Sequence, residues 1–453
     1  MAFTLKKSCL ALVAGSVIAL PSVAELSAAD VGKLGTTLTP IGAEKAGNAA
    51  GTIPAWDGGL TKGPTEYKGG SYVDPFAADK PTLTIDGKNA DQYKDLVTAG
   101  QMAMLKKYPT YKMVVYPTHR SASFPQCHYN ETKQCAAVAK LAPGGNGVTG
   151  CTGGVPFPIP KDGNEAIWNT ELRYRGDTFA TNWAQAAVTR TGDYALVKFE
   201  YEYDFQYGNC SKPAAQREPN KIINFVQATT APARLAGQIL LVHDTIDQAK
   251  DPRSAWTYNP GQRRVRLAPQ VAYDNPGTAA DGLRTSDDFG MFNGATDRYN
   301  WKLVGKKEMY MPYNSYKLSD PKVSYGDILK PGHINQDLAR YELHRVWVVE
   351  ATLKPGASHI YAKRVFFIDE DSWAILATDK YDARGDLWRF AEWHNENRYN
   401  IPMWYGTVEV HNDLQAGRYI AMGLQSGETK LYEVIKRTAA DYTPSNLRGA
   451  GTR

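Results

Sequence analysis

The stretch from residue 344 to residue 393 constrains the fold more than any other part of this sequence. It contains three runs rich in Val, Ile, Phe, Tyr and Trp, which are separated by clusters of Gly, Pro and Asp. Such runs, bounded by turn residues, are typical of consecutive antiparallel strands. In the first run, apolar side chains occupy every second position: Trp347, Val349, Ala351 and Leu353. This period predicts a sheet with one dry face.

A short strand is expected over 111–117. Similar runs recur from about residue 167 onward, and no helical pattern separates them. There the expected strands are 194–207, 222–230, 238–245, 255–259, 263–267, 301–309, 341–353, 361–367, 373–378, 387–393 and 404–411. Strands without intervening helices predict a mainly β fold with one large, strongly curved antiparallel sheet, because so many strands curl toward a barrel or split into two layers.

Residues 89–107 form the clearest expected helix, with Asn89 as its N-cap and Pro109 just beyond its end. We expect this helix to fill the concave side of the sheet or to cover one edge. Before it, residues 38–64 are dense in Gly and Pro, so they cannot form a long regular element. We favour an ordered arm anchored by Ile53 and Trp56 over a flexible linker. A short helix is expected to begin after Ser27.

The first 24 residues have the pattern of a signal peptide. Lys6 and Lys7 precede an apolar run over 10–20, and small residues end at Ala24, where we expect cleavage. The sequence therefore predicts an exported, periplasmic protein with three parts: the signal peptide over 1–24, an N-terminal arm, helix and disulfide-stapled loop region over 25–165, and a curved β half-barrel over 166–453.

Charge argues against a nucleic-acid partner. The chain has 52 Lys and Arg against 47 Asp and Glu, and the expected signal peptide holds two of the lysines and no acidic residue. A net charge of about +3 is too small for a polyanion-binding face. The densest basic run, over 263–266, would divide its arginines between two faces of a strand.

Four cysteines follow the signal peptide, and an even number in an exported chain predicts two disulfides. Of the three possible pairings we favour Cys127 with Cys135 and Cys151 with Cys210. A zinc site with His119 and His128 is the alternative, although the spacing of Cys127 and Cys135 matches no usual zinc motif.

We find no motif for catalysis or a cofactor among the eight histidines and the glycine-rich loops. The acidic residues Asp287, Asp288 and Asp297 offer oxygen ligands for calcium, but their spacing fits no known calcium loop. Capping of local turns explains them better. We therefore expect neither an enzyme nor a metal site.

Several long stretches resemble one exported Proteobacterial family, the domain of unknown function 1329. They are residues 153–176, 263–276, 281–314, the arm over 38–59 and the 344–393 meander. The resemblance implies a fold like that of the lipoprotein-sorting proteins LolA and LolB, an unclosed antiparallel barrel with helices covering its concave side and an apolar cavity between. It also implies, as partners, an RND-type exporter in the inner membrane and an outer-membrane protein. It defines no catalytic residues.

Two functions remain open at this point. One is a periplasmic carrier for a lipid or another hydrophobic molecule, and the other is a structural adaptor of an envelope complex that binds no small molecule. For the carrier, we expect aromatic and aliphatic residues of the strands to form the cavity wall: Phe225, Trp301, Trp347, Val349, Leu353, Phe366, Trp373 and Trp388.

Overall fold

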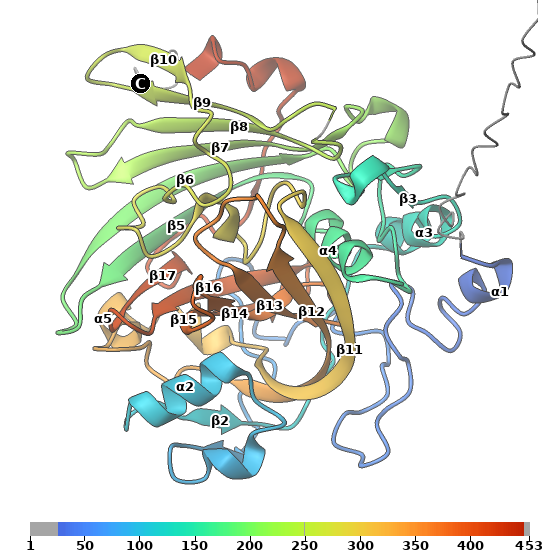
Figure 1. Ribbon diagram of the computed structural model, residues 1–453, viewed down its shortest axis with the longest axis vertical. Helices are drawn as coiled ribbons and strands as arrows, with labels where there is room; N and C mark the ends of the chain where they lie inside the picture. The colour runs from blue at the N-terminus through green and yellow to red at the C-terminus, as the bar shows by residue number, and fades with distance from the viewer. Residues whose placement is uncertain (1–25, 249, 448–453) are drawn as a thin grey trace, which may run out of the picture.

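The computed structural model describes residues 26–248 and 250–447, and its largest element is a 16-stranded sheet (Figure 1). The expected signal peptide over 1–24 lies outside these residues. The first meander of the sheet consists of β5 (Thr178–Val188), β6 (Tyr194–Phe205), β7 (Lys221–Ala231), β8 (Ile239–Thr245), β9 (Ser254–Asn259) and β10 (Arg264–Leu267). The second consists of β11 (Tyr299–Pro312), β12 (Tyr341–Leu353), β13 (Lys363–Asp369), β14 (Ile375–Tyr381), β15 (Leu387–Asn397), β16 (Trp404–Asp413) and β17 (Arg418–Leu424).

The two meanders form one sheet because the last strand, β17, pairs antiparallel with the first, β5. Strands β10 and β11 are not paired with each other, so the described sheet does not close into a barrel. Its pairs are antiparallel apart from one parallel contact, between β12 and β2 (Met113–Val115). The expected mainly β fold with a large, curved, unclosed sheet is thus confirmed.

Shorter elements surround the sheet. The remaining strands are β1 (Leu83–Ile85), β3 (Lys140–Leu141), β4 (Val148–Thr149) and β18 (Glu433–Val434). The α-helices are α1 (Ala28–Val31), α2 (Ala99–Lys107), α3 (Gln126–Cys135), α4 (Gly163–Leu172) and α5 (Tyr325–Ile328). The 3-10 helices are η1 (Ala90–Tyr93), η2 (Pro143–Gly145), η3 (Ala214–Gln216), η4 (Ser286–Asp288), η5 (Tyr316–Leu318) and η6 (Ala439–Asp441).

The expectation of a single helix over 89–107 is wrong. Its first part is η1, and α2 begins separately, after Thr98, whose hydroxyl accepts the N–H of Gln101 in a capping box. Asn89 does not cap a helix, because its side chain bonds to the backbone of Thr84 and Asp86 instead.

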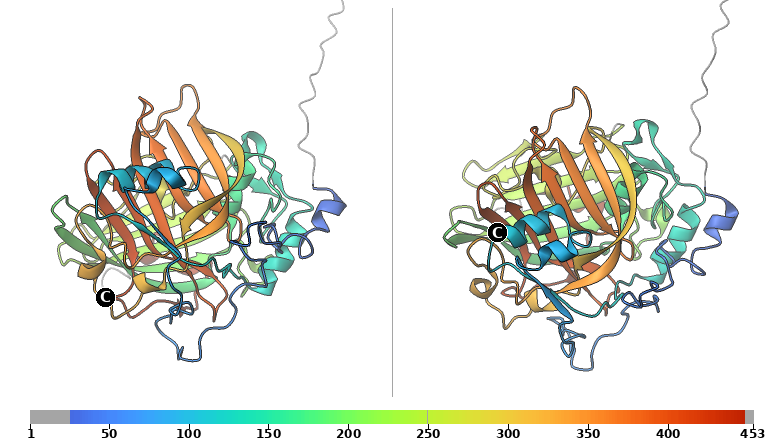
Figure 2. Two further views of the ribbon diagram at one scale, coloured as in Figure 1. Left: turned by 90° about the horizontal axis from the view of Figure 1, so that it is seen from below. Right: turned by 60° about the horizontal axis from the view of Figure 1, so that its bottom comes forward.

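Helix α2 covers the face of the sheet opposite to the expected one (Figure 2). It packs on β14 and β15 at Gly100, where an added Cβ would lie 2.0 Å from the ring of Phe390. Successive residues of a strand point to opposite faces, so Phe390 and Glu392 define an outer face under α2. Trp393 then belongs to the inner face, which is the concave one.

The prediction of one dry face for the 341–353 strand is also wrong. Val346 and Val348 are buried, as are Val349 and Ala351 on the other side of β12. Both faces are dry here because these residues belong to one apolar core, which also contains Val97, Met104 and Leu105 from the N-terminal part of the chain. A strand pattern by itself does not reveal such a cover.

The N-terminal arm packs against the rest of the protein. Ile53 is only 1% exposed, and the guanidinium of Arg120 donates to the carbonyls of Glu44, Lys45 and Pro54. Arg120 also forms a buried ion pair with Asp371, at 2.7 Å. The arm is therefore attached to the turn between β13 and β14.

The favoured disulfide pairing is corrected by the structure, in which Cys127 pairs with Cys210 and Cys135 with Cys151. The Cα atoms of these pairs are 6.0 Å and 5.3 Å apart. Cys127 and Cys135 lie near opposite ends of α3, and eight residues of helix span about 12 Å, too far for a disulfide. The four cysteines that follow the expected signal peptide are all disulfide-bonded, so the zinc alternative is not supported.

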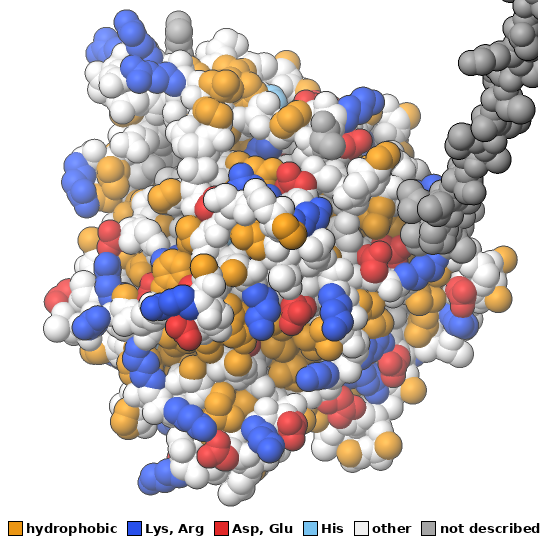
Figure 3. Space-filling view, viewed as in Figure 1, with side chains coloured by type: hydrophobic (Ala, Val, Ile, Leu, Met, Phe, Trp, Pro, Cys, Tyr) orange, Lys and Arg blue, Asp and Glu red, His pale blue; other side chains and the backbone are white. Residues whose placement is uncertain are grey.

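Among the described residues, no helix is both long and apolar enough to cross a membrane. Basic and acidic side chains are interspersed over the face shown in Figure 3, in agreement with the small net charge.

Candidate ligand-binding cavity

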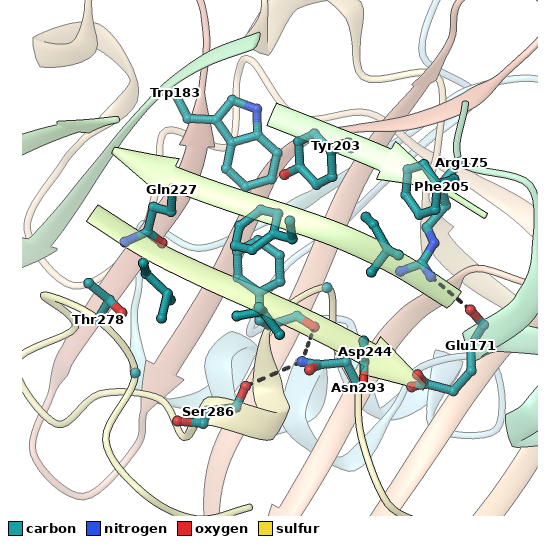
Figure 4. A pocket seen from close by; sticks show the side chains of 18 of the residues that line it. Glu171, Arg175, Trp183, Tyr203, Phe205, Gln227, Asp244, Thr278, Ser286 and Asn293 are labelled. Atoms are coloured by element: carbon teal, nitrogen blue, oxygen red, sulfur yellow. Dashed lines mark hydrogen bonds between the residues drawn. The ribbon is translucent and has the colours of Figure 1, made fainter. Parts of the chain in front are cut away.

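A cavity of about 150 Å³ lies against the inner face of the first meander (Figure 4). Its wall is mostly aromatic and aliphatic, with Phe179, Trp183, Tyr203, Phe205, Phe225 and Leu240 as main members. A dry cavity of this size has room for one aromatic ring, according to the engineered cavity that binds benzene. It is smaller than the roughly 300 to 1,000 Å³ of sites for drug-sized ligands.

Strand register explains why these side chains meet. Phe179 on β5 lies opposite Tyr203 on β6, which lies opposite Phe225 on β7, which lies opposite Val242 on β8. Directly opposed residues share a face, so the four form one row across the sheet. The ring centroids of Phe179 and Tyr203 are 5.0 Å apart, and those of Tyr203 and Phe225 are 5.2 Å apart.

The connection between the two meanders, residues 268–298, covers the cavity. Phe289 is its main contact: the ring centroid lies 5.9 Å from those of both Trp183 and Phe225. Asn293 supports this turn by donating to the carbonyls of Ser286 and Phe289. The cover is therefore a loop rather than a helix, and a ligand larger than one ring has to displace it or extend beyond it.

One end of the cavity is charged. Helix α4 ends at Leu172, with Arg173 as its C-cap. The helix end and the residues after it bring Glu171, Arg173 and Arg175 to the wall, where Asp244 and Arg253 join them. Burial raises the pKa of Glu171 to about 8. Burial, together with the adjacent Arg175, lowers the pKa of Arg173 to about 9.

The inner face of the second meander, in contrast, is filled. The cover segment inserts Asp287 and Asp288 there, at 2.6 Å from Arg364 and 2.7 Å from Lys380. Burial by itself would raise the pKa of Asp288, but Lys380, His411 and Arg364 hold it well below its usual value.

Two of the three acidic residues considered as calcium ligands take part in these ion pairs. The charges of Asp287 and Asp288 are matched by cations, and each carboxylate also accepts a bond from Thr285, as expected for turn caps. Asp297 accepts the hydroxyl of Tyr273. The three carboxylates therefore have partners of their own.

Of the eight expected wall residues, Phe225 lines the cavity. Trp301 and Phe366 lie on the inner face of the second meander, where the ring centroid of Phe292 is 5.3 Å from that of Trp301 and 5.7 Å from that of Phe366. This filled region belongs to the same apolar core as Val349 and Leu353.

The three remaining tryptophans lie elsewhere. Trp347 and Trp373 stack with centroids 6.2 Å apart, and Trp373 donates to the carbonyl of Ile41 in the arm. Trp388 packs beside Arg389 and donates to Asp413. None of these three lines the cavity.

Sequence reasoning missed most of the true wall, although a signal was present. In β6, aromatic residues occupy four alternate positions: Phe199, Tyr201, Tyr203 and Phe205. Helix α4 was missed too, although Asp162 followed by Glu165 marks its start, and Asp162 caps it.

Two other features are less suited to a ligand. His344, Asp369 and Asp371 place ligand atoms within 4.8 Å of one another, but Arg120 already holds both oxygens of Asp371 and is part of the attachment of the arm. A hollow of about 320 Å³ near Tyr72 and residues 429–433 is lined mainly by polar surface.

Comparison with known proteins places the chain in a family. The profile described as "Protein of unknown function (DUF1329)" matches residues 84–448. An uncharacterized protein of Pseudomonas aeruginosa is 53% identical over 445 residues, which cover 97% of each chain.

Two solved structures are similar at low identity. A putative outer membrane lipoprotein-sorting protein domain from Vibrio parahaemolyticus is 12% identical, with a TM-score of 0.43, covering 63% of this chain and 97% of its own. A LolA superfamily protein from Nitrosomonas europaea is 13% identical, with a TM-score of 0.38, covering 63% of this chain and 98% of its own. The profile match and the close relative confirm the expected resemblance: this chain belongs to the DUF1329 family of proteins of unknown function.

Proposed function

We propose that this protein binds and carries a hydrophobic molecule in the periplasm, without covalent chemistry. The observation that carries the proposal is the aromatic row on the inner face of the first meander, which borders an unfilled cavity under a loop cover. Apolar walls with a few convergent polar groups are characteristic of small-molecule sites. The two disulfides support export to an oxidising compartment.

The size of the cavity limits what apolar contact contributes. Burying about 200 Å² of apolar ligand surface contributes about 5 kcal/mol before ordering costs are subtracted. That corresponds to a dissociation constant weaker than micromolar. A carrier built on this cavity therefore needs polar contacts as well, or a ligand that extends past the cover.

The adaptor function has less support. The large apolar side chains exposed among the described residues are few: Val138, Tyr194, Leu267, Val304, Ile360 and Val434. An adaptor surface would instead show a contiguous apolar patch.

The RND-type exporter and the outer-membrane partner are proposed on the family resemblance alone. Cross-linking in intact cells, followed by identification of the captured envelope proteins, tests them. Capture of neither class of protein would remove the partners from the proposal and leave ligand binding untouched.

The binding proposal is tested with the neutral fluorescent probe N-phenyl-1-naphthylamine, whose phenyl ring matches the size of the cavity and whose naphthyl group has to displace the cover or extend beyond it. We expect saturable binding to the wild type and its loss in Leu240→Trp, because the larger ring fills the cavity from β8. The matched control is Leu196→Trp, a half-buried leucine of β6 outside the cavity wall, which should bind like the wild type. Equal binding by both variants, or no binding by the wild type, would contradict the proposal.

A further inference from the structure

Two arginines, Arg173 and Arg175, lie at the charged end of the cavity and bear on the polar part of the ligand. Arg173 leaves α4 with an extended backbone, at φ −60° and ψ 157°. Alternate residues of an extended segment share a side, so Arg173 and Arg175 both reach the cavity wall, while Tyr174 between them packs near His128. The guanidinium of Arg173 lies 5.1 Å from the Trp393 ring, and that of Arg175 lies 5.0 Å from Phe205.

Neither arginine has a carboxylate partner among the described residues. Arg173 donates to the carbonyl of Thr170, and Arg175 to the carbonyl of Glu171. The Nε of Arg175 is buried and has no hydrogen-bond acceptor. The planar fork of each guanidinium thus keeps donor capacity that the protein does not use.

Acidic groups nearby attract the two arginines, but no carboxylate in the described part of the chain bonds to either of them. Asp244 is held by Arg253 through bonds of 3.0 and 2.7 Å. Glu409 accepts His411 and the N–H of Gly290. Glu171 approaches the N–H of Gly294 with one oxygen, and its other oxygen, Oε1, has no partner. The raised pKa of Glu171 keeps this carboxyl mostly protonated at neutral pH.

A buried cation without an anion is costly, and proteins normally pair such groups. We propose that Arg173 and Arg175 form the subsite for the anionic head group of an amphipathic ligand, a carboxylate or a phosphate, whose apolar part lies along the aromatic row. This inference rests on the proposed function. Arginine suits both head groups, because its fork binds carboxylate and phosphate in a bidentate manner. Figure 4 shows that the charged residues lie at one end of the cavity: Arg175 and Glu171 are at this end, and Trp183 and Gln227 lie toward the other.

The test uses three ligands with the same ten-carbon chain: decanoate, decyl phosphate and decanol. Titration calorimetry of the full mature chain should show at least one anion binding about 10- to 100-fold more tightly than decanol, the ratio expected for hydrogen bonds to a charged group. The tighter of the two anions identifies the head-group class.

Variants then assign this preference to the arginines. In the double variant Arg173→Gln, Arg175→Gln, we expect the anions to bind no more tightly than decanol, while binding of decanol persists. Arg173→Lys, Arg175→Lys retains the charge and should retain part of the preference. Arg266→Gln, an exposed arginine on β10, is the matched control and should behave like the wild type.

The outcomes separate the two proposals. If the wild type binds decanol as tightly as both anions, or if the glutamine variant keeps the preference, the anion subsite is wrong and the hydrophobic cavity still stands. If the wild type binds none of the three, the proposed function fails, and the subsite fails with it. The wild-type comparison requires no variant to fold, so the subsite can be tested in any case.

Discussion

The two meanders present the same face of one sheet to the interior, but they treat buried charge in opposite ways. On the second meander, Asp287 and Asp288 pair with Arg364 and Lys380, and apolar side chains fill the remaining space. On the first meander, Arg173 and Arg175 have no carboxylate partner among the described residues, and a cavity remains beside them. Matched charge thus accompanies a structural core, and unmatched charge accompanies the candidate binding site.

A single short segment connects the two regions. Helix η4 places Asp287 and Asp288 in the filled region, and the next residue, Phe289, closes the cavity. The ion pairs therefore fix the position of the cavity's cover. Within the same connection, Tyr273, Ala279, Asp281 and Met291 have positive φ values between 49° and 73°, a conformation that persists only where the surroundings hold it.

The largest effect on stability is expected from removing an ion pair of the second meander. Asp288→Asn leaves Lys380 buried without its counter-ion, which costs about 4 kcal/mol in the free energy of unfolding. Urea denaturation measures this loss. The matched control is Asp91→Asn, whose partner Lys106 is exposed, and it should leave stability unchanged. Similar stability of both variants would show that the matched charges do not hold this region together.

The second prediction concerns how the stability of the protein depends on pH through Glu171. The pKa of Glu171 is raised from 4.5 in the unfolded chain to about 8 in the folded chain, so the folded state binds the extra proton. Its contribution is complete below pH 4.5 and is lost as the pH rises toward 8. Relative to Glu171→Gln, the wild type should lose about 2.5 kcal/mol between pH 5.5 and 7.5.

The ion pairs of the second meander should depend on pH in the opposite sense. The depressed pKa of Asp288 means that its contribution is present at neutral pH and is lost in acid. Urea denaturation of the wild type, of Glu171→Gln and of Asp288→Asn at several pH values checks both signs. Parallel stability profiles for the wild type and Glu171→Gln would contradict the assigned pKa of Glu171.

Trp347 provides a third, smaller test. It is half-buried and stacks on Trp373, so Trp347→Ala should lower the free energy of unfolding by about 2 kcal/mol. Binding of N-phenyl-1-naphthylamine should remain as in the wild type, because this residue lies outside the cavity wall. Loss of probe binding at full stability would return Trp347 to the candidate site.

The smallest effect on stability is expected at the charged end of the cavity, on the first meander. Arg175→Met removes a buried cation that has no carboxylate partner, so unfolding should require the same free energy or about 1 kcal/mol more. The corresponding change in the filled region, Arg364→Met, should be strongly destabilising. A large loss of stability in Arg175→Met would mean that Arg175 has a structural role.

The sheet was predictable because strand patterns are local. The alternation along 194–207 and 341–353 corresponds to β6 and β12 within a few residues. The cavity was not predictable in this way, since both meanders carry inward aromatic residues. Which region is filled depends on the placement of Phe289 and Phe292 in a loop that has no periodicity. The disulfide pairing similarly depends on α3, which separates Cys127 from Cys135.

The most direct test is mass spectrometry of the small molecules extracted from protein purified from the periplasm without denaturation, for the wild type and for Leu240→Trp. We expect an amphipathic molecule with an acidic head group in the wild type and its absence from the variant. The same molecules in equal amounts in both proteins would contradict binding in the cavity of the first meander.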